Sequence, residues 1–222
     1  MKNNILIIAA HPDDEIIGVG GTILKHVKGD DQVNILILSD GESSRDSGIA
    51  IKKRQTQAKK VAEKLGVNKL FTDKLPDNKF DLVPLLNIVK KVEKIIKKIK
   101  PNIIYTHCPY DLNIDHRLTF KAVLTACRPQ PSFFVKKILT FETLSSTEWQ
   151  IKDSAHVFCP TEYTDISEFI NKKIEIFKIY KDEIRDYPHP RSIEGLKILA
   201  KYRGIEVGLK FAEAFQIIRN IK

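Results

Sequence analysis

The stretch NILIIAAHPDDE, residues 4–15, decides the fold and points to the chemistry. Its first half is an apolar run with the length of a buried strand, and its second half contains one histidine and three acids. Carboxylates at the end of a buried strand cost free energy unless something pairs with them. A bound cation would remove that cost, so we expect further ligands for a cation elsewhere in the chain.

The first 130 residues alternate between apolar runs and helical patterns. The apolar runs predict strands at residues 4–10, 32–39, 69–72 and 102–106, and the helical patterns predict helices at 15–28, 50–65, 82–100 and 115–127. Because the strands are continuously apolar, they are typical of a parallel sheet that helices cover on both faces. The predicted fold class is α/β, a Rossmann-like three-layer αβα arrangement with a mostly parallel sheet.

The pattern changes after residue 131. Strands are expected at residues 137–144 and 155–159, and helices at 165–180 and from the vicinity of Arg191 onward. Residues 212–219 are expected to form a last strand, with a helix as the alternative. No repeat, linker or low-complexity segment separates this part from the first. We therefore predict a single domain over residues 1–222, in which residues 1–130 form the core βα units and residues 131–222 complete the site.

The composition indicates a soluble globular protein, with a hydrophobic share of 42% and a charged share of 29%. No apolar run approaches the roughly 20 residues that span a bilayer, and the N-terminus lacks the pattern of a signal peptide. Three widely spaced cysteines argue against a disulfide framework. We therefore expect a cytoplasmic protein without a membrane span.

The net charge of +9 suggests an anionic partner at first sight. The lysines between residues 90 and 100, however, alternate with an apolar stripe that includes Ile88, Val92 and Ile96. They are therefore expected to form the solvated face of an amphipathic helix. Because no zinc knuckle or recognition helix accompanies them, we predict no nucleic-acid partner.

A second polar cluster, HCPYDLNIDHR at residues 107–117, follows the predicted strand 102–106. Sites in open α/β sheets form at the carboxyl ends of the strands, and right-handed crossovers would place this cluster and residues 11–15 at the same edge. One His and one Asp from the first cluster and one His from the second would supply three ligands. Such a set, with a fourth position open for water, is typical of catalytic zinc.

The HPDDE of residues 11–15 and the DHR of residues 115–117 together resemble the PIG-L/LmbE-like family of zinc-dependent N-deacetylases. The resemblance continues through FETLSSTEW at 141–149, PHPRS at 188–192, the RG of 203–204 and AEAF at 212–215. These enzymes remove the acetyl group from N-acetylglucosamine-type sugars. The resemblance therefore implies an LmbE-like domain, a small N-acetylated sugar as the substrate and frequent self-association into homo-oligomers.

Specific roles follow from this resemblance for four residues. It implies that His11, Asp14 and His116 hold one zinc ion per chain, although iron would also suit these ligands. Asp13 would be the general base that takes a proton from the zinc-bound water, and the resulting hydroxide would attack the acetamide carbonyl. The same carboxyl group would return the proton to the leaving amine.

The chain departs from the family pattern at one place. Many members have H-x-D-H before the arginine, and the first of these histidines helps to stabilise the oxyanion. Here Asn113 occupies that place, followed by Asp115 and His116. We predict Asn113 and Asp115 as catalytic residues, with Asn113 donating a hydrogen bond without carrying charge. His107 and His189 are the alternatives for that role.

Other polar residues are candidates for substrate binding because they follow predicted strand ends or match family motifs. They are Glu42, Ser43, Ser44, Arg45, Arg54, His189 and Arg191. For Arg54, the alternative is an exposed helix arginine, and for the segment around His189 it is a turn fixed by hydrogen bonds. Trp149 and Tyr110 could stack on a sugar or simply pack.

The sequence thus predicts a zinc-dependent N-deacetylase of an amino sugar. A first alternative is an amidase of the same fold that cleaves another amide, such as a thiol–sugar conjugate. A second is a nucleotide-binding module, suggested by Gly18-Val19-Gly20-Gly21, although these glycines do not complete G-x-G-x-x-G. A third is a basic protein that binds nucleic acid or an anionic membrane.

Overall fold

The computed structural model describes residues 2–41, 48–131 and 133–222. Its centre is β1 (Asn4–Ala9), the apolar run that precedes the acidic loop. β1 lies between β2 (Gln32–Ser39) and β4 (Ile103–His107) and is parallel to both. β3 (Lys69–Leu75) continues the parallel sheet beyond β2, and β5 (Lys137–Phe141) continues it beyond β4.

Two further strands extend the sheet on the β5 side. β7 (Ala212–Asn220) is antiparallel to β5 and to the short outer strand β6 (Glu162–Asp165). The strand order is β3-β2-β1-β4-β5-β7-β6. The prediction of a mostly parallel α/β sheet is confirmed, and so is the predicted strand at 212–219.

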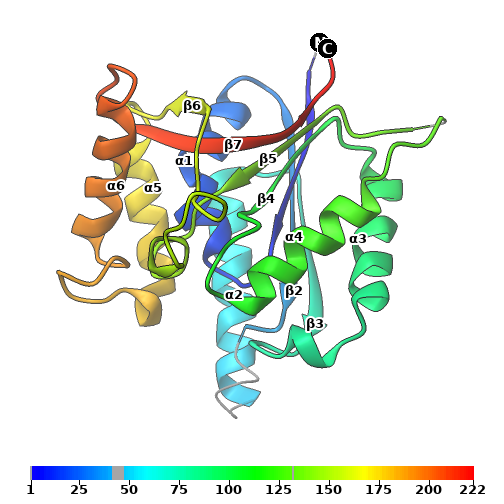
Figure 1. Ribbon diagram of the computed structural model, residues 1–222. Coiled ribbons are helices and arrows are strands. Elements are labelled where there is room, and N and C mark those ends of the chain that lie inside the picture. Colours follow the sequence, from blue (N-terminus) through cyan, green and yellow to red (C-terminus); the bar gives the residue numbers. More distant parts are fainter. Residues whose placement is uncertain (1, 42–47, 132) are drawn as a thin grey trace.

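Helices cover both faces of the sheet, so the molecule has three layers: helices, sheet and helices (Figure 1). Alternate residues of β1 point to opposite faces, which is why the core has two parts. On one face, Ile5 and Ile7 pack with α1 (Asp14–Lys28), α2 (Gly48–Leu65), α5 (Ile170–Phe177) and α6 (Ile193–Ile205). On the other face, Leu6 and Ile8 pack with α3 (Leu85–Ile99) and α4 (Ile114–Ala126).

α3 has the amphipathic form that its sequence predicts. Ile88, Val89, Val92 and Ile96 are buried against the sheet, whereas Lys94 and Lys98 are exposed. These lysines therefore lie on a solvated helix face. Within residues 2–41, 48–131 and 133–222, no helix combines the length and hydropathy that a membrane crossing needs.

Two predictions beyond residue 150 are wrong. Residues 155–159 form no strand, because the pairing with β7 begins only where the Thr161 backbone N–H donates to Phe215 O. The helix predicted at 165–180 is shorter, since Asp165 belongs to β6 and pairs with Ala212. α5 therefore starts at Ile170 and passes into a 3-10 segment, Lys178–Glu183.

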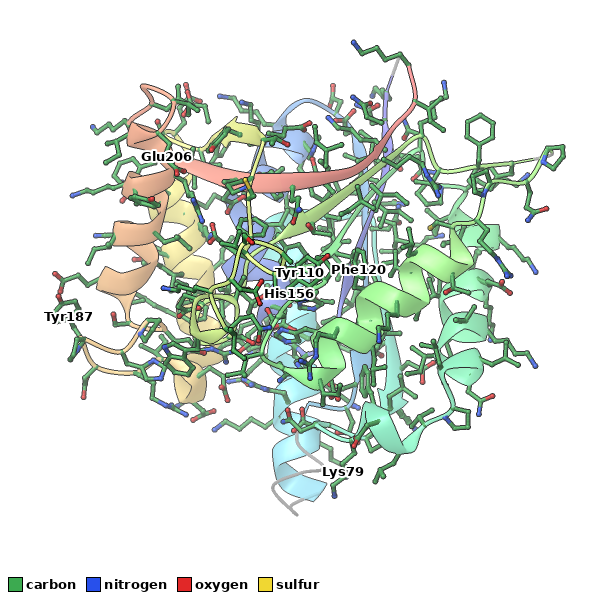
Figure 2. The ribbon with its side chains drawn as sticks, in the orientation of Figure 1. Lys79, Tyr110, Phe120, His156, Tyr187 and Glu206 are labelled. Carbon is green, nitrogen blue, oxygen red and sulfur yellow. The ribbon has the colours of Figure 1, made fainter. Side chains whose placement is uncertain are left out.

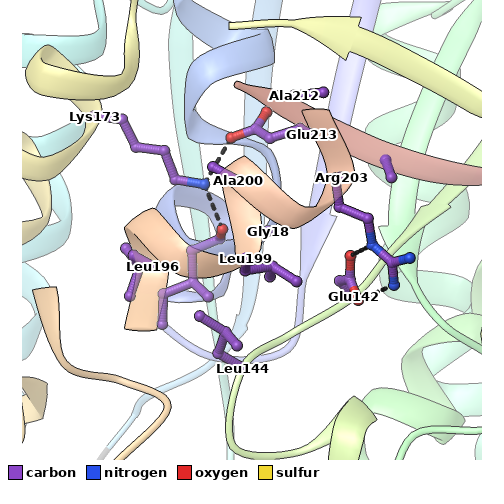
Figure 3. Close-up of a pocket in the computed structure, with 12 residues that line it drawn as sticks. Gly18, Glu142, Leu144, Lys173, Leu196, Leu199, Ala200, Arg203, Ala212 and Glu213 are labelled. Atoms are coloured by element: carbon purple, nitrogen blue, oxygen red, sulfur yellow. Dashed lines mark hydrogen bonds and ion pairs between the residues drawn. The ribbon is translucent and has the colours of Figure 1, made fainter. Parts of the chain in front are cut away.

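A buried ion pair joins the C-terminal part of the chain to α1 (Figure 3). Lys173 Nζ donates to Glu213 Oε1 and to Ile17 O, each at 2.7 Å. The Glu213 carboxylate also accepts the backbone N–H groups of Gly21 and Thr22, at 2.8 and 2.7 Å. Because α1 starts at Asp14, this contact ties residues 131–222 to the element that carries one of the three predicted metal ligands.

Candidate metal centre

The two polar clusters predicted from the sequence meet at the carboxyl ends of β1 and β4. His11 and Asp14 come from the β1–α1 junction, and His116 lies in the first turn of α4. The Nδ1 atom of His11 lies 3.2 Å from the Nε2 atom of His116. The sheet topology therefore brings together side chains that are more than a hundred residues apart, as the parallel crossovers predict.

These three side chains form a set suited to a divalent cation. Asp14 Oδ2 lies 3.4 Å from His11 Nδ1 and 3.4 Å from His116 Nε2, and the three residues are buried and could hold a metal ion. Bonds of about 2.0–2.1 Å in a tetrahedral zinc site place neighbouring ligand atoms about 3.4 Å apart. Asp14 Oδ1 is buried and has no hydrogen-bond partner within the part of the chain that the structure describes. The observed spacing and this atom both fit a bound cation.

Carboxylates lie behind each imidazole and orient it. His116 Nδ1 lies 3.1 Å from Asp111 Oδ1, on the ring side opposite the candidate ligand atom. His11 Nε2 lies 3.0 Å from Asp115 Oδ2 and 3.3 Å from Asp77 Oδ1. A carboxylate in this position fixes the tautomer of a ligating histidine. Of the three acids, the sequence predicted only Asp115 as a site residue.

The surrounding charges shift the pKa values of the cluster strongly. Burial opposes the charge of His11, but the carboxylates of Asp115 and Asp14 raise its pKa to about 10. Burial likewise opposes the charge of His116, whereas Asp14 and Asp111 raise its pKa to about 9. For Asp14, burial favours the neutral form, but His116 and His107 hold its pKa well below the ordinary value. The carboxylates therefore favour positive charge at this place, and a bound cation would compete with protons for the imidazole nitrogens.

Asp13 precedes α1 in a left-handed backbone conformation, with φ of 112°. That conformation is costly for a residue other than glycine and is typical of functional sites. The Asp13 backbone N–H donates to Glu15 Oε2 at 2.9 Å, and Tyr180 donates its hydroxyl to Glu15 Oε1 at 2.8 Å. Glu15 thus supports the turn that sets the direction of the Asp13 side chain.

Two arginines surround the Asp13 carboxylate. Arg191 Nη1 lies 2.9 Å from Asp13 Oδ2, and Arg54 Nη2 lies 3.7 Å from the same oxygen. Glu183 bridges both guanidiniums, at 2.7 Å to Arg54 and 3.2 Å to Arg191. Burial raises the pKa of Asp13 to about 6, although Arg191 and Arg54 oppose the shift. Arg54 is only 4% exposed, so the alternative of an exposed helix arginine is wrong.

Asn113 has a structural partner for each end of its amide. It is the N-cap of α4, where its Oδ1 accepts the Asp115 backbone N–H at 2.8 Å. Its Nδ2 donates to Asn78 Oδ1 at 3.1 Å. A cap of this kind satisfies a free N–H in the first turn of the helix.

The two alternative histidines differ in accessibility. His107 is fully buried, stacks on His116 with 3.9 Å between ring centroids, and accepts the Ala10 backbone N–H at Nε2. His189 is partly exposed, and its Nδ1 accepts the Arg191 backbone N–H at 3.0 Å. This bond leaves the hydrogen of His189 on Nε2.

Each of the two aromatic candidates, the exposed Trp149 and the partly buried Tyr110, lies beside a histidine. Trp149 stands edge-on to His189, with 5.7 Å between ring centroids. Tyr110 and His156 lie next to each other in front of the sheet, with 5.0 Å between their ring centroids (Figure 2). The predicted substrate-binding residues Glu42, Ser43, Ser44 and Arg45 lie outside the described residues.

Sequence reasoning missed Asp77, Asp111 and Glu183 as parts of this centre. Asp111 lay within the quoted cluster at 107–117, so its position after β4 was a usable signal. Asp77 and Glu183 belong to no motif and reach the centre only through the tertiary fold.

Comparison of the sequence with known proteins identifies the family of this chain. Residues 6–127 match the family model PIG-L, described as GlcNAc-PI de-N-acetylase. The chain belongs to the PIG-L family. It is 26% identical over 230 residues to a diacetylchitobiose deacetylase of Thermococcus kodakarensis, covering 98% of this chain and 84% of that protein.

Solved structures share the fold of this PIG-L family member. An N,N'-diacetylchitobiose deacetylase from Pyrococcus horikoshii superposes with a TM-score of 0.77 at 22% identity, over 96% of this chain and 83% of that one. The 4-carboxy-2-hydroxymuconate hydratase GalB from Pseudomonas putida KT2440 superposes with a TM-score of 0.76 at 18% identity, over 98% and 96%. Because a hydratase has the same fold, the reaction must be argued from the site.

Proposed function

We propose that the protein is a metal-dependent hydrolase that removes the acetyl group from an N-acetylglucosamine-type sugar or sugar conjugate. The observation that carries the proposal is the buried set of His11, Asp14 and His116 beside the Asp13 carboxylate, which is held by two arginines. The diacetylchitobiose deacetylase that resembles the chain over most of its length supports an N-acetylated sugar as substrate.

The three ligands suit zinc, the metal we propose. A zinc ion bound there supplies a Lewis acid that acidifies a water molecule and polarises the amide carbonyl. The protein's own contribution is to fix the ligands, through Asp111 behind His116 and Asp115 behind His11. Asp115 accordingly acts by positioning His11 rather than by touching the substrate. The Phe80 backbone N–H, which donates to Asp115 Oδ1 at 3.0 Å, holds that carboxylate in turn.

Asp13 is the group that moves the proton. It accepts a proton from the attacking water and delivers it to the amine nitrogen as the C–N bond breaks, which releases acetate and the amino sugar. Burial raises the pKa of Asp13 above the ordinary value, which favours a carboxyl group that must hold a proton before it returns it. Arg191 and Arg54 keep the carboxylate in place and supply positive charge beside the substrate.

His189 is the better candidate for the donor that stabilises the oxyanion. Both ends of the Asn113 amide have structural partners, and His107 is fully buried beneath His116. His189 instead is partly exposed, presents an Nε2–H, and lies two residues from the arginine that contacts Asp13. Arg54, His189, Arg191 and residues 42–45 remain the proposed contacts of the sugar.

The test is a combined measurement of metal content and acid release. We expect zinc-loaded protein to release acetate from N-acetylglucosamine, its β1,4-linked dimer or a conjugate, and the Asp13→Asn variant to keep its zinc while losing release. Release of a different carboxylic acid from a thiol–sugar conjugate would favour the other amidase. Absence of any acid release from zinc-loaded protein across both panels would refute the proposed hydrolase.

A further inference from the structure

The segment at residues 143–149, which follows β5, is a tightly hydrogen-bonded turn beyond residues 6–127, the range that the family model matches. The Thr143 backbone N–H donates to Thr147 Oγ1 at 2.8 Å, and the Thr147 N–H donates to Thr143 O at 2.9 Å. Glu148 accepts the backbone N–H groups of Ser145 and Ser146. We refer to this segment as the 143–149 turn. Its backbone is fixed by its own side chains.

The 143–149 turn presents two hydroxyl groups to one buried carboxylate. Ser146 Oγ donates to Asp111 Oδ1, and Thr147 Oγ1 donates to Asp111 Oδ2 at 2.7 Å. A third donor, the Asn113 backbone N–H, reaches Asp111 Oδ1 at 2.9 Å. Asp111 itself is 0% exposed. Both oxygens of Asp111 therefore accept hydrogen bonds, and these bonds restrict the rotation of the carboxylate.

The position of Asp111 decides which nitrogen of His116 faces the candidate ligand set. Asp111 Oδ1 lies 3.1 Å from His116 Nδ1, so Nδ1 faces this carboxylate and Nε2 is left to face the candidate ligand set. Nε2 is the atom that lies 3.4 Å from Asp14 Oδ2. Loss of either hydroxyl would allow the carboxylate, and with it the imidazole, to rotate.

The same turn reaches the Asp13 side of the centre. Leu144 O accepts a hydrogen bond from Arg191 Nε at 3.3 Å, and Arg191 Nη1 contacts Asp13 at 2.9 Å. One short segment of the C-terminal part therefore braces both the candidate metal ligand in α4 and the arginine beside the proposed base.

We propose that Ser146 and Thr147 are positioning residues that set the metal affinity of the site by holding Asp111 against His116. The inference rests on the proposed function, because it requires that His116 binds the cation. It assigns a role to the Ser146 and Thr147 hydroxyl groups, which the proposed chemistry otherwise leaves without one.

The test compares zinc affinity and the cobalt spectrum in variants of the full chain. Zinc affinity is measured by competition with a chromophoric chelator, and the visible absorption of the Co²⁺-loaded protein reports the ligand geometry. Loss of a group that orients a ligating histidine weakens metal binding by about 10- to 100-fold. Ser146 and Thr147 act on His116 through Asp111, so we expect Ser146→Ala and Thr147→Val each to weaken zinc binding by about 10-fold, the lower end of this range, and to change the Co²⁺ spectrum.

Two further variants separate positioning from folding. Thr147→Ser keeps the hydroxyl, so it should retain wild-type affinity and spectrum. Thr140→Val alters a buried hydroxyl of β5 that contacts Gln216 O instead of Asp111, so any loss of stability should leave zinc affinity unchanged. The thermal midpoint of each metal-free variant shows that it is folded.

The outcomes distinguish this inference from the function on which it rests. Wild-type affinity and spectrum in folded Ser146→Ala and Thr147→Val would overturn the inference while leaving the hydrolase intact. The same loss in Thr140→Val as in Thr147→Val would also overturn it, because the effect would then be one of general packing. Wild-type protein that binds neither Zn²⁺ nor Co²⁺ would overturn both proposals.

Discussion

Substitution of Gly18 tests why α1 contains glycines. They either allow close packing of the helix against the sheet or, as the nucleotide-binding alternative requires, leave room for a phosphate group. A Cβ atom added at Gly18 would lie 2.3 Å from Phe141 Cδ2 and 2.9 Å from two other atoms of that ring. Phe141 is fully buried at the end of β5 and cannot move aside freely. Gly18→Ala gains about 1 kcal/mol of helix propensity, but a clash of this depth should cost about 2–3 kcal/mol, the upper part of the usual range for overpacking.

We therefore expect Gly18→Ala to lower the free energy of unfolding by about 1–2 kcal/mol. For a chain of this size, such a loss lowers the thermal midpoint by about 2–8 °C. Gly20→Ala is the matched control, because its added Cβ meets chiefly the terminal methyl of Ile16, at 2.6 Å. A methyl at the end of a side chain can rotate away, so this variant should change stability by less than about 1 kcal/mol.

The assay is urea or thermal unfolding of the two variants beside the wild type. Equal stability of Gly18→Ala and Gly20→Ala would refute the packing argument. Tight binding of a dinucleotide, lost in both variants, would restore the nucleotide-binding alternative.

Three further predictions concern the ion pair, the helix cap and the metal. Lys173→Met should cost about 3–5 kcal/mol, because it leaves Glu213 buried without its cation, and adding Glu213→Gln should recover part of the loss in urea unfolding. Asn113→Ala should lower stability by about 1 kcal/mol through loss of the α4 cap, whereas Asn113→Asp should not. A full loss of activity in Asn113→Asp would instead argue for a direct catalytic role of the amide. Zinc at a hundred times its dissociation constant should stabilise the protein by about 2.7 kcal/mol, seen as a higher thermal midpoint, and Asp14→Asn should abolish the effect.

Much of the fold follows from local patterns in the sequence. The continuous apolar run of β1 requires cover on both faces, and Ile5 and Leu6 indeed pack against different helix layers. The stripe of α3 similarly fixes which side of that helix faces the sheet. The strand predicted at 155–159 was wrong, because a segment of β-like composition does not form a strand where no partner strand pairs with it.

The residue types at the two strand ends indicated one His and one Asp from the first cluster and one His from the second, and the family resemblance implied which residues these are. His11, Asp14 and His116 lie at such places, and the parallel crossovers bring them together. The residues behind them were harder to predict. Asp77 and Glu183 act through contacts with residues distant in the sequence, and nothing in their neighbours marks them. The amide partners of Asn113 also depend on the tertiary position of Asn78.

The central claim is that two distant loops hold a single cation between them. Zinc titration of the metal-free protein, followed by calorimetry, tests it most directly when wild type and His116→Ala are compared. The account predicts one equivalent of tightly bound zinc in the wild type and a loss of that binding in His116→Ala. Equal zinc binding by the two proteins, or none by the wild type, would contradict it.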